Sequence, residues 1–234
     1  MTIIVGQGWD VESFTVHEDL LIAYSAFFKS CLDSHFEEAI KKPVELPEDG
    51  PRDFEAVVNW LYHGTTTIED DISHSAVFRM MTAYKLADKL IMPKLKNHLV
   101  DSVRELLRER NIFLSLEDIS VHCQSNIKGD KLYDLTLKLF VWVLHNSAET
   151  IKLEPTIEAG AFANVVLVQD LVTMVRDYNL QAWENPTTLV GCHWHDHSDR
   201  STCEFADFEP PRLPSTSHGG NKARRLGRRN GRWC

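Results

Sequence analysis

The hydrophobic pattern changes period within residues 13–32, which have the sequence SFTVHEDLLIAYSAFFKSCL. Polar and apolar side chains alternate over Ser13–His17, and this is the period of a half-buried strand. From Glu18 the apolar residues recur instead at helical spacing, at Leu20, Leu21, Tyr24, Phe27, Phe28, Cys31 and Leu32. Ser25 is of a type that caps helices, so it predicts a break into two short helices.

One more strand is expected on each side of this stretch. Residues 2–5 are Thr-Ile-Ile-Val and are followed by Gly6, so they predict a strand that pairs with Ser13–His17 as a hairpin whose turn is residues 6–10. Gly6-Gln7-Gly8 after a strand also suggests a dinucleotide-binding loop, but Val11 stands where that loop needs glycine or alanine, which favours the hairpin. Residues 43–47 predict a short strand, and its flanking prolines favour a sheet edge.

Helical periodicity dominates the chain after residue 50. Pro51 is typical of a helix start, and Gly64 is typical of the residue just past a helix end. Between them the apolar residues Phe54, Val57, Val58, Leu61 and Tyr62 share one helix face. Residues 65–68 are β-branched and predict one more strand. Two further helices are expected over residues 77–91 and, after Pro93, over residues 95–107, which makes the N-terminal half α+β.

The C-terminal half has a different organisation. From about Asn111 the sequence predicts only helices, with apolar stripes over residues 132–143 and 167–178 and with Asp130 as an N-cap of the first. Residues 204–234 are rich in proline, glycine, serine and arginine, which is typical of disorder. The expected domains are therefore 1–108, a helical extension at 109–180, a Cys/His-containing segment at 181–203, and a disordered basic tail at 204–234.

Several groups of residues in combination resemble the BTB/POZ domain. They are FTVHEDLL at 14–21, SAFF at 25–28, FEE at 36–38, VELPED at 44–49, FE at 54–55 and WLYHG at 60–64. The resemblance covers residues 1–108 and implies the BTB/POZ fold, a short mixed β-sheet capped by helices. The helical part and the Cys-x-x-His-x-His segment further resemble fungal BTB proteins.

This resemblance implies a protein–protein interaction module with protein partners. One expectation is a substrate adaptor for a cullin-based ubiquitin ligase complex. No kelch propeller or zinc-finger array follows in the sequence, which favours a more general interaction role. Many dimeric BTB proteins exchange an N-terminal helix and strand, whereas this sequence starts inside the first strand. A monomer and a late gene-model start both stay open.

A cluster of metal-ligand residue types lies near the C-terminus, at Cys192, His195, His197 and Cys203. Two thiolates and two imidazoles are the ligand types of a tetrahedral zinc site. In an extended segment His193, His195 and His197 would share one face, so any two of them could bind the metal. The spacing differs from that of a C2H2 zinc finger, and the alternative is an exposed polar tail. No other cofactor is expected.

The net charge of −9 is unevenly distributed. Residues 219–234 hold six basic residues and no acidic one, which leaves 19 basic against 34 acidic residues, or −15, for residues 1–218. Phosphate backbones favour clustered positive charge, so nucleic acid is an expected partner only through the basic tail. The alternative function is therefore a nucleic-acid-associated regulator that uses this tail and the Cys/His metal site.

Neither an enzyme nor a membrane protein is expected. The sequence has no Gly-x-Ser-x-Gly, His-Glu-x-x-His, phosphate-loop or Cys-x-x-Cys motif. Cys31 lies on a core-facing stripe and is expected to be buried and inert. No apolar run approaches the roughly 20 residues of a membrane span. The N-terminus lacks the features of a secretory signal, so localisation in the cytoplasm, the nucleus or both is predicted.

Overall fold

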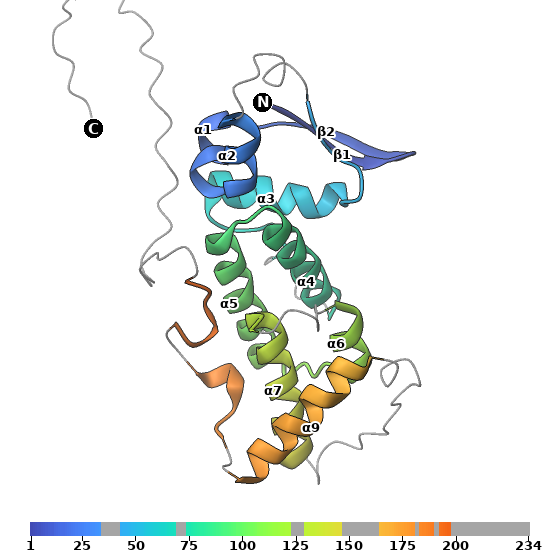
Figure 1. Cartoon of the computed structure of the whole chain (residues 1–234), viewed down its shortest axis with the longest axis vertical. Coiled ribbons are helices and arrows are strands. Elements are labelled where there is room, and N and C mark those ends of the chain that lie inside the picture. Colours follow the sequence, from blue (N-terminus) through green and yellow to red (C-terminus); the bar gives the residue numbers. More distant parts are fainter. Residues whose placement is uncertain are drawn as a thin grey trace, which may run out of the picture.

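The computed structural model describes residues 1–33, 43–68, 74–122, 129–146, 164–180, 183–189 and 192–197. A small sheet and the helices of residues 18–63 lie at one end, the helices of residues 74–110 follow, and the helices of residues 131–146 and 165–180 lie at the other end (Figure 1). The predictions for residues 36–38, Cys203 and the tail 204–234 fall outside the described residues. None of the described helices is long and apolar enough to cross a membrane.

The sheet confirms the predicted hairpin. Its strands are β1 (Thr2–Gln7), β2 (Asp10–Thr15) and β3 (Val44–Leu46), in the order β2-β1-β3. The β1–β2 pair is antiparallel and β3 lies parallel to β1, at the predicted edge. The hairpin is tighter than predicted, because both strands continue up to Gly8 and Trp9. Gly6 has φ of 93°, and a Cβ there would lie 1.9 Å from the carbonyl oxygen of Asp10, so the turn itself explains this glycine.

Ser25 separates two short helices as predicted. They are α1 (Glu18–Tyr24) and α2 (Ala26–Asp33). The Ser25 hydroxyl oxygen accepts a hydrogen bond from the Phe28 amide at 3.2 Å, and the hydroxyl donates to the Leu90 carbonyl at 2.6 Å. Ser25 therefore caps α2 and also fixes it to the turn that follows α4.

Three longer helices form the centre of the molecule. They are α3 (Pro51–His63), α4 (His74–Lys89) and α5 (Pro93–Arg110), and Gly64 ends α3 with φ of 78°. The predicted strand at residues 65–68 is wrong, because this segment forms a turn. Ile68 is only 1% exposed, so its β-branched side chain serves the core and not a strand ladder.

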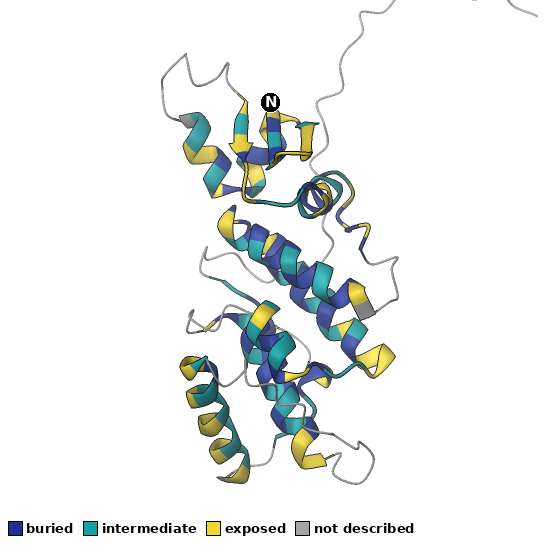
Figure 2. Cartoon of the chain, turned by 90° about the vertical axis from the view of Figure 1, so that its right-hand side faces the viewer, coloured by how far each residue is buried: buried dark blue, intermediate teal, exposed yellow. Residues whose placement is uncertain are grey.

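The C-terminal half adds α6 (Leu116–His122), α7 (Lys131–Asn146) and α9 (Val165–Leu180). Asp130 caps α7 as predicted, because its carboxylate accepts a hydrogen bond from the Tyr133 amide at 2.9 Å. Buried side chains from the sheet through α5 to α7 belong to one hydrophobic cluster. The outermost helix, α9, has a single buried residue among those described, Leu167 (Figure 2).

The sulfur-containing side chains of the helices differ in burial. Met80 and Met81 of α4 are both buried in the core. Cys31 was expected to be buried, and this is wrong, because the residue is only partly buried. It lies one helical turn beyond Phe28, which is the fully covered residue of α2.

Candidate metal centre and interaction cleft

The C-terminal segment, which the structure describes at residues 183–189 and 192–197, packs against α5 and α7. It contains two single 3₁₀ turns, Pro186–Thr188 and Cys192–Trp194. Trp194 is 2% exposed, and its indole N–H donates a hydrogen bond to the Pro186 carbonyl at 3.2 Å. The ammonium of Lys138 on α7 lies 5.3 Å from the centroid of the Trp194 ring system. The buried indole therefore holds both turns against the helices.

Polar side chains of α5 hold the same segment from the other side. Asn97 makes two hydrogen bonds with the backbone of Asp196, one to its carbonyl at 3.0 Å and one from its amide at 2.7 Å. The Arg104 guanidinium donates to the Leu189 carbonyl. These contacts join residues that are 85 to 99 positions apart in the sequence.

Three of the four predicted metal ligands come together in this segment. One ligand atom each of Cys192, His195 and His197 lies within 4.8 Å of the other two. Cys192 is exposed, whereas His195 is 8% exposed. Both ring nitrogens of His197 are buried and have no hydrogen-bond partner within the described parts of the chain. The predicted fourth ligand, Cys203, lies outside the described residues.

His193 does not join this cluster. Residues 192–194 form a 3₁₀ turn and not the extended segment that would place every second side chain on one face. The His193 ring instead contacts the Trp194 ring at a centroid distance of 4.4 Å. Burial and the nearby charges of Lys138 and Lys131 lower the pKa of His193.

Asp101 is a member of the site that sequence reasoning missed. Its Oδ2 lies 2.7 Å from Nε2 of His195, and its Oδ1 lies 3.1 Å from the Arg104 guanidinium. The aspartate is on α5, 94 residues before His195. No local sequence signal could have paired the two, because only the packing of the C-terminal segment against α5 brings them into contact.

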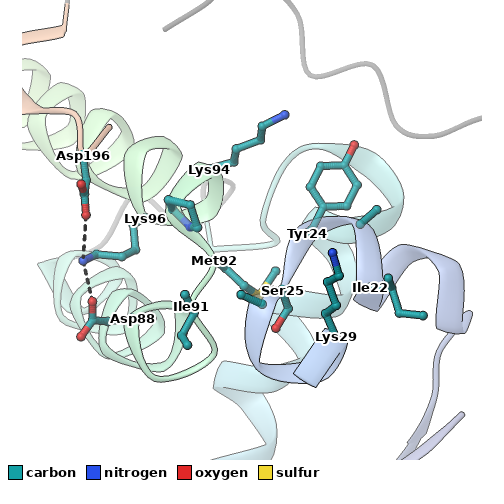
Figure 3. A pocket seen from close by; sticks show the side chains of 13 residues that line it. Ile22, Tyr24, Ser25, Lys29, Asp88, Ile91, Met92, Lys94, Lys96 and Asp196 are labelled. Atoms are coloured by element: carbon teal, nitrogen blue, oxygen red, sulfur yellow. Dashed lines mark hydrogen bonds and ion pairs between the residues drawn. The ribbon is translucent and has the colours of Figure 1, made fainter. Parts of the chain in front are cut away.

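A second candidate site is an open cleft of about 580 Å³ between the α1–α2 junction and the turn that joins α4 to α5. Its apolar lining includes Ile22, Ile91 and Met92, and Lys29 and Lys94 lie beside them (Figure 3). The Lys94 ammonium lies 5.7 Å from the centroid of the Tyr24 ring, and burial raises the pKa of Tyr24.

One apolar residue of the cleft is held in an uncommon backbone conformation. Ile91 has φ of 53°, in the left-handed region, and is 55% exposed. The Met92 amide donates to the Ala87 carbonyl, and the Ile91 amide donates to the Asp88 carbonyl. This is the Schellman arrangement, in which the position of Ile91 is usually glycine. A β-branched residue is strained there, so the turn presents an apolar side chain to solvent at some cost in stability.

The C-terminal segment also reaches this cleft. Lys96 lies between two carboxylates that line it, with its ammonium 2.6 Å from Asp88 and 3.8 Å from Asp196 (Figure 3). Asp196 stands between two of the candidate metal ligands in the sequence, His195 and His197. The Cys/His cluster and the cleft are therefore neighbouring sites.

Comparison with known proteins identifies the N-terminal half. The family model for the BTB/POZ domain matches residues 1–107. A search of curated proteins finds no match to the chain, so the likeness to fungal BTB proteins stays a prediction. BTB domains are generally protein–protein interaction modules and not enzymes. The match, the mixed three-stranded sheet and the helices around it show that residues 1–107 of this chain are a BTB/POZ domain.

Proposed function

We propose that the chain is a protein-interaction adaptor that recruits a substrate protein to a cullin-based ubiquitin ligase. The observation that supports this role is the firm connection between the BTB domain and the helical extension. An adaptor must hold two partners at a defined separation, so its two parts need a shared core. Here Tyr84 of α4 donates a buried hydrogen bond to Asp130, the N-cap of α7, at 2.9 Å.

The cleft beside Ile91 is the proposed surface for the recruited protein. Interface centres are apolar and have polar rims. Ile22 and Ile91 provide the apolar part, and neither Lys29 nor Lys94 forms an ion pair with a described residue. A partner segment with an apolar side chain next to acidic residues complements this cleft in shape and charge.

Affinity purification of the tagged full chain from its native cells tests the adaptor role. We expect mass spectrometry to find a cullin and a RING subunit together with the chain. Recovery of other protein partners without any cullin would contradict the ligase role and leave a general interaction module. Light scattering on the purified protein would distinguish a monomer from a homodimer.

A pair of variants tests the cleft. Ile91→Asp puts a charge into the apolar part of the cleft, and Val172→Asp makes the same change at a 64% exposed residue of α9. We expect Ile91→Asp to lose a recruited protein that Val172→Asp retains. Equal recovery of every partner protein by both variants would exclude the cleft as the recruiting surface. Recovery of the cullin is scored separately, because it tests the ligase role and not the cleft.

A nucleic-acid-associated regulator is the second candidate. It is favoured by the composition of residues 219–234, which hold six basic residues and no acidic one. Affinity for DNA that falls steeply with salt and disappears on deletion of residues 219–234 would support it. Absence of binding at low salt would refute it. A reporter fused to these residues tests whether the tail directs import into the nucleus, and a diffuse reporter would contradict that role of the tail.

A further inference from the structure

We propose that Cys192, His195 and His197 bind a structural zinc ion that fastens the C-terminal segment to α5. Three kinds of observation carry this inference: the ligand types and their separation, the buried nitrogens of His197, and the carboxylate behind His195. None of them depends on the adaptor role.

The separation of the ligand atoms is close to that of a zinc site. Zinc binds thiolate sulfur at about 2.3 Å and imidazole nitrogen at about 2.0 Å in tetrahedral geometry, which places neighbouring ligand atoms roughly 3.3–3.6 Å apart. One ligand atom from each of Cys192, His195 and His197 already lies within 4.8 Å of the others. Small side-chain rotations would close the remaining distance, and one tetrahedral position would stay open for a fourth ligand.

His197 supplies the second observation. A neutral imidazole has one N–H donor and one nitrogen acceptor, and buried polar atoms in proteins almost always have partners. Both ring nitrogens of His197 are buried without a hydrogen-bond partner among the residues that the structure describes. A metal ion at the cluster would satisfy one of these two nitrogens.

His195 supplies the third observation. Histidines that bind zinc commonly use their second ring nitrogen to bond a carboxylate, which fixes the tautomer and the ring orientation. Asp101 lies 2.7 Å from Nε2 of His195, and Arg104 holds Asp101 from its other oxygen at 3.1 Å. In such a pair the metal binds the other ring nitrogen, which for His195 would be Nδ1.

The position of the cluster indicates a structural role for the ion. Trp194, buried against the Lys138 ammonium, lies between Cys192 and His195, and Asp196, bound to Asn97, lies between the two histidines. A zinc ion would join residues on both sides of these two anchors. Through Asp101 it would also tie the segment to the last helix of the BTB domain.

Metal analysis of the full chain, dialysed after loading with zinc chloride, tests the inference. We expect about one zinc ion per chain in the unmodified protein. Cys192→Ser and His197→Gln should lose the ion. His193→Gln and Cys31→Ser should keep it, because these are a histidine of the same segment outside the cluster and a cysteine of α2. Circular dichroism would establish that each variant is folded.

Two further readouts separate metal binding from a merely structural effect of the substitutions. Cobalt in place of zinc should give a thiolate charge-transfer band that disappears in Cys192→Ser and persists in His193→Gln. Asp101→Asn should weaken zinc binding roughly 10- to 100-fold, the usual effect of removing such a carboxylate. Zinc content near zero in the unmodified chain, or equal zinc content in Cys192→Ser and His193→Gln, would overturn the inference.

Discussion

The hydrogen bond between Tyr84 and Asp130 provides a direct test of whether the BTB domain and the helical extension are energetically coupled. Tyr84 is 4% exposed and Asp130 is 7% exposed, and their side chains meet at 2.9 Å. Burial and the neighbouring Asp130 carboxylate raise the pKa of Tyr84, so the phenol stays protonated and donates. The perturbation is Tyr84→Phe, which removes the donor and keeps the ring.

The size of the effect follows from the charge and burial of the acceptor. A hydrogen bond to a charged group contributes about 1.5–3 kcal/mol, and a buried acceptor that loses its donor cannot recover this from water. We expect Tyr84→Phe to lower the free energy of unfolding by about 2 kcal/mol. In a chain of this size the melting temperature should then fall by roughly 4–8 °C.

Substitutions of Asp130 provide the matched comparison. The Tyr84 hydroxyl and the Tyr133 amide donate to different oxygens of Asp130, and Asp130→Asn keeps one of these two acceptors, so the loss should be smaller than in Asp130→Ala. Asp130→Ala should lose the bond from Tyr84 and also about 1 kcal/mol of N-cap stabilisation.

Urea unfolding of the four proteins of the Tyr84→Phe and Asp130→Ala cycle measures the coupling. We expect a single transition and an interaction energy of about 1–2 kcal/mol between the two residues. The reasoning would be refuted by additive effects of the two substitutions, or by a Tyr84→Phe variant within about 0.5 kcal/mol of the unmodified protein. Two separate transitions would show that the extension unfolds independently of the BTB domain.

Three more predictions concern pH, the role of Cys203 and the hairpin. Burial and the nearby Lys85 lower the pKa of His122. The unfolded chain therefore binds a proton at this histidine more readily than the folded chain does. The contribution of His122 to the free energy of unfolding is present above its ordinary pKa and is lost as the pH falls from about 7 to 5. His122→Phe keeps the stacked contact with Phe78 but has no group to protonate. In urea titrations at pH values of about 7 and 5, the free energy of unfolding should therefore fall less in this variant than in the unmodified protein. Cys203→Ser should weaken zinc binding at least about tenfold in competition with a chelator, and unchanged affinity would exclude Cys203 as a ligand. Gly6→Ala should destabilise the fold by more than about 2 kcal/mol in thermal unfolding, and a smaller loss would contradict the steric reason given for Gly6.

The elements that could be predicted from the sequence are those with local signals. The strand pair of the hairpin, the cap at Ser25, the end of α3 at Gly64 and the cap at Asp130 all depend on residues within a few positions of each other. Their physical causes are equally local: side-chain alternation, a capping oxygen and the conformational freedom of glycine. The same local patterns, in combination, pointed to the BTB/POZ domain.

The local signals failed where burial or distant contacts decide the outcome. Residues 65–68 have strand composition, yet they form a turn because Ile68 is needed in the core and the segment has no partner strand in the described sheet. Cys31 lies on the predicted stripe, but the packing around α2 covers Phe28 more completely.

The sequence by itself determined the residue types of the candidate metal cluster, whereas only the tertiary structure decided which of these residues meet. His193 lies in a 3₁₀ turn and stays outside the cluster that His195 and His197 form with Cys192. The packing of the segment on α5 supplies Asp101 from 94 residues away. In the same way the α4–α5 turn and the α1–α2 junction, which are distant in sequence, create the cleft around Ile91. Residue chemistry is local information, but the distance between residues that are far apart in the chain depends on how the whole core packs.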